Sequence, residues 1–143
     1  MLIDDHLLLR ILLGDEPVDL RQRNGRLVTT GLWYHRLCRA LSNSTVSGAM
    51  SRMLGSADPV LGARAVAAMT ELPDDIGLAS LRDLAWPMAH LSDVGVRLNL
   101  MSLEALAAAE WCDAEICLAV ADANPQLIAA ASLRGVPLRL VVH

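Results

Sequence analysis

Three carboxylates occupy positions from which a folded chain could bring them to one site. Asp4 closes the short apolar run MLID, Glu104 lies near the start of the helical run SLEALAAAEWC, and Asp122 follows the apolar run ICLAV. A few hard oxygen ligands suit Mg²⁺ or Mn²⁺, and such an ion activates water and neutralises the charge that develops on a phosphodiester. Asp4, Glu104 and Asp122 are therefore candidate catalytic and metal-binding residues.

Short apolar runs typical of strands alternate with stretches of helical periodicity along the chain. The predicted strands cover residues 1–4, 26–30, 115–119 and 136–142. The predicted helices cover residues 5–14, 31–44, 49–54, 63–72, 80–91, 103–112 and 124–135, and residues 72–80 are predicted to form a turn. This alternation predicts a single α/β domain over residues 1–143, a three-layer sandwich with a mainly parallel sheet of four or five strands.

In a parallel sheet, ligands bind beyond the carboxyl ends of the strands. Asp4 and Asp122 each follow a predicted strand, and Glu104 is expected in the first turn of its helix, where the helix dipole favours an acid. We therefore expect the three carboxylates to meet at one sheet edge. The alternative is a local role for each: a first-turn acid for Glu104, turn or cap residues for Asp122 and Asn124, and a helix cap for Asp5.

The composition limits the classes of partner. The hydrophobic fraction is 54% and the mean hydropathy is +0.40, yet charges interrupt every apolar run before it could span a membrane. The start MLIDDH lacks the basic residues of an export signal, so we expect a cytoplasmic protein. The net charge of −4 disfavours coating of nucleic acid. The surplus apolar surface predicts a homodimer or a complex with a small protein partner.

The cysteines do not indicate a disulfide framework or a zinc site. There are three of them, an odd number, and only Cys112 and Cys117 lie near each other in sequence. No second pair and no histidine at ligand spacing completes a tetrahedral zinc site. Reduced, buried thiols are the expected state.

The chain resembles the PIN-domain family in its element order and in the placement of its acids. The similar features are LID at the start, an acid two residues into SLEALAAAEW, an acid eighteen residues further on after a strand, and LIAAASLRGVPLRLVV. The resemblance spans nearly the whole chain and is specific in residues 1–14 and 100–142. It implies the PIN fold and metal-dependent ribonuclease activity, often that of the toxin in a toxin–antitoxin pair.

Residue by residue, the resemblance assigns Asp4 to the first acid of the family, Glu104 to the third and Asp122 to the fourth. The second acid is missing, because the register that aligns the leucines of TTGLWYHRLCRAL places Arg36 where the family has Glu. Val120 replaces the Thr that commonly precedes the last acid. The segment ANPQL is also longer than is usual in the family before the next helix begins. Asn124 therefore competes with Asp122 for the position of the last acid.

Two functions follow from this pattern. The first is a Mg²⁺- or Mn²⁺-dependent endoribonuclease with a weakened metal site, in which Arg36 contacts substrate phosphate. The second is a catalytically inactive PIN-like domain used for partner binding or dimerisation, in which Arg36 enters the acid cluster and replaces the cation.

Four aromatic residues have two possible roles. They could stack on the bases of RNA, or they could belong to the core or to an interface. They are Trp33, Tyr34, Trp86 and Trp111.

Overall fold

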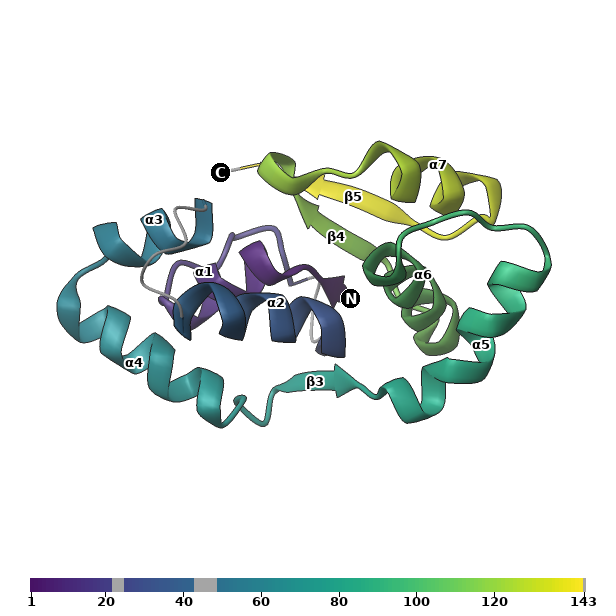
Figure 1. Ribbon diagram of the computed structural model, residues 1–143. Helices are drawn as coiled ribbons and strands as arrows, with labels where there is room; N and C mark the ends of the chain where they lie inside the picture. The colour runs from purple at the N-terminus through teal and green to yellow at the C-terminus, as the bar shows by residue number, and fades with distance from the viewer. Residues whose placement is uncertain (22–24, 43–48, 143) are drawn as a thin grey trace.

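A computed structural model describes residues 1–21, 25–42 and 49–142. Five parallel strands form one sheet in the order β3-β2-β1-β4-β5. Figure 1 labels β3, β4 and β5. The strands are β1 Leu2–Ile3, β2 Leu27–Thr30, β3 Ile76–Ala79, β4 Ile116–Ala119 and β5 Leu138–Val141. The prediction of an α/β protein with a mainly parallel sheet of four or five strands is confirmed.

Seven α-helices and one short 3₁₀ helix connect the strands of the described chain. They are α1 Asp5–Leu12, α2 Gly31–Ser42, α3 Ala49–Ser56, α4 Pro59–Thr70, α5 Leu81–Asp93, α6 Leu100–Cys112, η1 Val120–Asp122 and α7 Pro125–Leu133. The predicted end of the second helix, at residue 44, lies outside the described residues. No helix in the described ranges has the length and apolar character that a membrane crossing requires.

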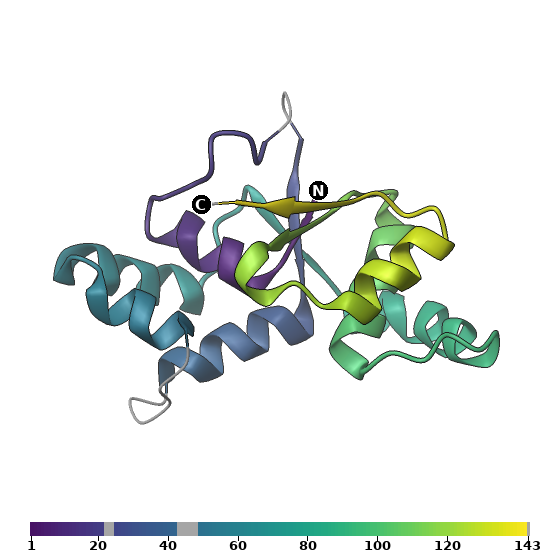
Figure 2. The ribbon, with the colours of Figure 1, turned by 90° about the horizontal axis from the view of Figure 1, so that it is seen from above.

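The helices cover both faces of the sheet, which gives two cores (Figure 2). Strand alternation sends neighbouring side chains to opposite faces. In β4, Ile116 and Leu118 therefore pack in the core that α5, α6 and α7 share, whereas Cys117 and Ala119 pack in the core of α1, α3 and α4. All four β4 residues are buried, as expected for a strand covered on both faces.

Short polar side chains fix where the helices near the sheet edge begin. Asp4 caps α1 and Asn124 caps α7, which also has Pro125 at its first position and Gly135 at φ +70° after its end. α6 begins at the cap Asn99, earlier than predicted. Glu104 therefore lies in the second turn of α6, and its expected place in the first turn is corrected.

β3 lies in residues 72–80, where the sequence pattern predicts a turn, and that prediction is wrong for Ile76–Ala79. The strand has the sequence IGLA, with a glycine and no clear alternation of polar and apolar residues. It pairs with β2 over four residues and forms one edge of the sheet. Its strand conformation is therefore set by pairing with β2, a contact that local sequence does not encode.

The direction of winding reverses at β1. The chain runs from β1 through β2 to β3 on one side, and then returns to place β4 on the other side of β1. β1 and β4 lie in register, with Leu2 opposite Ile116 and Ile3 opposite Cys117. Ligands of open parallel sheets bind at this switch point, beyond the carboxyl ends of the two strands. Asp4 follows β1 directly, and η1 with Asp122 follows β4.

Candidate functional site

Asp4 ties the end of β1 to the end of β4. Its side chain is fully buried, Oδ1 accepts a hydrogen bond from the backbone N–H of Leu7 at 2.8 Å, and Oδ2 accepts one from that of Ala119 at 2.7 Å. Burial raises the pKa of Asp4 to about 7, although the two backbone N–H groups act to lower it. The neighbouring charges of Asp5 and Asp122 raise this pKa further, because like charges disfavour the ionised form of Asp4.

Arg36 lies among these aspartates and binds two of them. Its Nε and Nη2 donate to the two carboxylate oxygens of Asp5, and Nη2 also donates to Oδ2 of Asp122. The side chain of Asp5 is fully buried, whereas those of Arg36 and Asp122 are about a third exposed, at 32% and 33%. These charge-assisted hydrogen bonds raise the pKa of Arg36 above its ordinary value, and the bonds to Asp5 contribute more than the bond to Asp122. The guanidinium therefore stays charged.

The pairing of Arg36 corrects the expected role of Asp5. The sequence pattern predicts a helix cap at Asp5, but Asp4 is the cap and Asp5 is the first residue of α1. The packing of α2 against α1 brings Arg36 to Asp5 across 31 positions of sequence. The sequence pattern placed Arg36 near an acid cluster but did not identify Asp5 as its main partner.

Glu104 binds the first turn of α2 instead of the aspartates. Its side chain is fully buried, and Oε2 accepts a hydrogen bond from the backbone N–H of Leu32 at 2.9 Å. Oε1 has no hydrogen-bond partner within the described ranges, and a Cβ atom at Gly31 would lie 3.4 Å from it. Glu104 therefore satisfies one of the free N–H groups at the start of α2 and joins that helix to α6.

Asp122 and Asn124, the two candidates for the last acid position, have different partners. Asp122 reaches Arg36. Asn124 caps α7 through the backbone N–H groups of Gln126 and Leu127 and donates to Oγ of Ser102 at 3.0 Å. Asp122 is thus the residue that shares the site with Asp4.

In this arrangement Asp4, Glu104 and Asp122, the predicted ligands of Mg²⁺ or Mn²⁺, each have another hydrogen-bond partner. Both oxygens of Asp4 accept backbone N–H groups, Asp122 binds Arg36, and the guanidinium already supplies a positive charge to the cluster. Across the described residues, no three His, Cys, Asp or Glu side chains are grouped so that they could hold a metal ion. Metal binding by these three residues stays a prediction.

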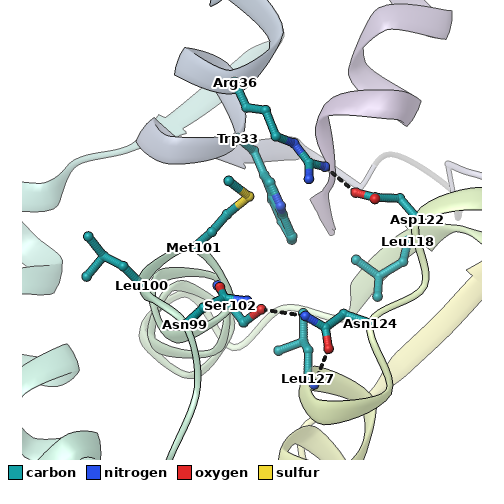
Figure 3. A pocket seen from close by; sticks show the side chains of 10 residues that line it. All are labelled: Trp33, Arg36, Asn99, Leu100, Met101, Ser102, Leu118, Asp122, Asn124 and Leu127. Carbon is teal, nitrogen blue, oxygen red and sulfur yellow. Dashed lines mark hydrogen bonds and ion pairs between the residues drawn. The ribbon is translucent and has the colours of Figure 1, made fainter. Parts of the chain in front are cut away.

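A pocket of about 370 Å³ opens beside Arg36, between α2, the end of β4 and the starts of α6 and α7 (Figure 3). Arg36 and Asp122 meet on one side of the pocket, the bonded pair Asn124 and Ser102 lies on another, and Trp33 projects between them. The lining residues are Trp33, Arg36, Asn99, Leu100, Met101, Ser102, Leu118, Asp122, Asn124 and Leu127. Four of these residues, Trp33, Arg36, Asp122 and Asn124, are candidates that the sequence pattern indicates.

The fold and the site together define a doubly wound parallel α/β domain with an arginine-bridged carboxylate cluster at its switch point. Comparison with family models, with curated proteins and with solved structures finds no match to this chain.

Proposed function

We propose that this protein is a catalytically inactive binding domain, of PIN-like type, in which Arg36 takes the place of a divalent cation. The observation that carries the proposal is the position of its guanidinium, which bonds both oxygens of Asp5 and one of Asp122. A fixed positive charge there repels a dication and occupies two of the nearby carboxylates. The PIN-like acids at Asp4, Glu104 and Asp122 then serve the fold and the binding site.

Metal binding and RNA cleavage test this proposal together. Titration calorimetry with Mn²⁺ should show no binding to the wild type, which should also leave single-stranded RNA intact. Arg36→Gln should gain measurable Mn²⁺ affinity, because removal of the guanidinium frees Asp122 and removes a charge that opposes the ion. Arg134→Gln, which changes an exposed pair with Glu110, is the matched control and should behave as the wild type. Metal-dependent RNA cleavage by the wild type that is lost in Asp122→Asn would refute the proposal.

A Mg²⁺- or Mn²⁺-dependent endoribonuclease, of the toxin type, is the second candidate. The observation that favours it is the Oε1 atom of Glu104, which is buried and has no partner in the described chain. A buried carboxylate oxygen without a donor is the kind of group that a water molecule or a cation satisfies. The Mn²⁺ titration distinguishes the two candidates, since a Glu104→Gln change should lower metal affinity only if Glu104 is a ligand.

The partner of an inactive domain would bind through the apolar surface of the outer helices. Trp86 on α5 is 82% exposed, Trp111 at the end of α6 is 63% exposed, and Leu133 at the end of α7 is 89% exposed. Tryptophan is enriched in protein interfaces. We propose a homodimer or a small protein partner in the reducing cytoplasm, in keeping with the free thiols of Cys38, Cys112 and Cys117. Light scattering at high micromolar concentration that reports a monomer would argue against the homodimer.

A further inference from the structure

We propose that the pocket beside Arg36 binds a small organic anion whose carboxylate or phosphate group replaces Asp122 on the guanidinium. The inference deepens the proposed function and rests on its central point, that Arg36 and not a metal ion provides the positive charge of the site. In the absence of ligand, the carboxylate of Asp122 would occupy the position on Arg36 that the anionic group of the ligand takes. Arg36 would be the anchor that both recognise.

The two carboxylates on Arg36 are held very differently. Asp5 is fully buried at the start of α1 and uses both oxygens, so it orients the guanidinium permanently. Asp122 uses one oxygen, and its side chain is 33% exposed on η1, a three-residue segment without a buried residue. Solvent can therefore replace the contact of Asp122 with Arg36 at little cost. If Arg36 left Asp5, by contrast, the buried carboxylate of Asp5 would have no cation beside it.

Several hydrogen-bond donors of the pocket wall are unused. Nη1 of Arg36 and Nδ2 of Asn99 make no hydrogen bond to any described residue, although both side chains line the pocket. Ser102 accepts from Asn124 at 3.0 Å, which leaves its own hydroxyl proton available. A wall that offers unused donors around a guanidinium suits an acceptor group such as a carboxylate or phosphate.

The exchange keeps an anionic group on each side of Arg36. Asp5 holds one side of the guanidinium, and Asp122 binds the other. When a ligand displaces Asp122, that side chain moves toward solvent, and the carboxylate or phosphate of the ligand takes its place on Arg36. A cationic ligand has no comparable position, because the guanidinium already lies between the carboxylates.

The rest of the pocket is apolar and limits the ligand's size. Leu100, Met101, Leu118 and Leu127 line it together with Trp33, so the anionic group should be attached to a small apolar body. The volume of about 370 Å³ lies near the lower end of the range of about 300–1,000 Å³ for small-molecule sites. An aromatic or branched aliphatic acid, or a phosphate monoester of similar size, fits these limits.

The test is titration calorimetry in metal-free buffer with three probes: benzoate, phenyl phosphate and inorganic phosphate. The wild type should bind benzoate or phenyl phosphate. Asp122→Ala should bind the same probe about tenfold tighter, because the competing charge-assisted bond is absent. Benzyl alcohol, which lacks the charge, should not bind. The better of benzoate and phenyl phosphate identifies the anionic group, and weaker binding of inorganic phosphate would confirm the contribution of the apolar wall.

Two further variants test whether the probe binds to Arg36. Arg36→Lys retains one charge but loses the two-pronged geometry, so it should weaken the binding of the probe, and Arg134→Gln should leave it unchanged. Equal affinity in the wild type and Asp122→Ala, or no binding of any probe to Asp122→Ala whose melting temperature matches the wild type, would overturn the inference. Because no metal is present, failure here leaves the Mn²⁺ result of the proposed function untouched.

Discussion

Arg36 and Asp5 form a two-pronged ion pair between α2 and α1, with the carboxylate fully buried and the guanidinium partly exposed. The pair joins residues 31 positions apart and places a permanent positive charge at the switch point of the sheet. Asp122 binds the same guanidinium from the end of β4. One arginine thus connects the two halves of the sheet at the edge where ligands of such folds bind.

The first prediction concerns the stability that this pair confers. Arg36→Gln should lower the free energy of unfolding by about 2–3 kcal/mol, because it leaves the buried carboxylate of Asp5 without its cation. The value is below that for a wholly buried pair because Arg36 is partly exposed. Urea denaturation measures the change. Adding Asp5→Asn to Arg36→Gln should restore part of the loss, and a double variant less stable than the single one would contradict this explanation.

The second prediction is a dependence of stability on pH that Asp4 causes. Burial raises its pKa from 3.8 to about 7 in the folded state, so the folded protein holds a proton that the unfolded chain releases. The contribution of Asp4 is fully present below pH 3.8 and is lost as the pH rises through about 7. Taken alone it would lower the free energy of unfolding by up to about 4 kcal/mol across that range.

Denaturant titrations at several pH values check this effect. Asp4→Asn should flatten the decrease between about pH 4 and pH 7, because its side chain does not titrate. At low pH Asp4→Asn should be less stable than the wild type. The amide has one oxygen, which can accept the N–H of Leu7 or of Ala119, and its NH₂ group cannot accept the other. An equally steep decrease in Asp4→Asn would mean that other groups cause it.

The third prediction concerns the structural role of Glu104 in the absence of metal. Glu104→Gln should change the free energy of unfolding by less than about 1 kcal/mol, because its amide oxygen can still accept the N–H of Leu32. Glu104→Ala should cost about 2–4 kcal/mol, since it leaves that N–H unpaired and creates a cavity. Thermal unfolding in the presence of a chelator measures both, and Glu110→Gln on the exposed side of α6 is the control.

The fourth prediction concerns thiol reactivity. Burial raises the pKa of Cys117 to about 11, and its side chain has no solvent access within β4, whereas Cys112 is exposed at the end of α6. A chromogenic disulfide reagent at pH 8 should modify Cys112 rapidly and Cys117 only after unfolding. Mass spectrometry of the labelled protein identifies the site, with Cys112→Ser as control. Fast labelling of Cys117 in the folded protein would show that β4 opens locally.

The sequence determined the order of most elements because each is specified locally. Apolar runs of strand length, helical periodicity and the signals Asn124, Pro125 and Gly135 act within a few residues of the structure that they set. The position of Asp4 after the first strand was predictable for the same reason. These signals placed the candidate acids at the carboxyl ends of β1 and β4 without any knowledge of how the strands pair.

The tertiary structure decided what those acids bind. The pairing of β3 with β2, the reach of Glu104 to the start of α2, and the bonds from Arg36 to Asp5 and Asp122 join segments far apart in the sequence. The contacts of Glu104 and Arg36 depend on how α2 packs against α1 and α6, and no local propensity encodes that packing. The sequence therefore placed an arginine and several acids near one sheet edge, and only the packing of the helices made Arg36 the cation of the site.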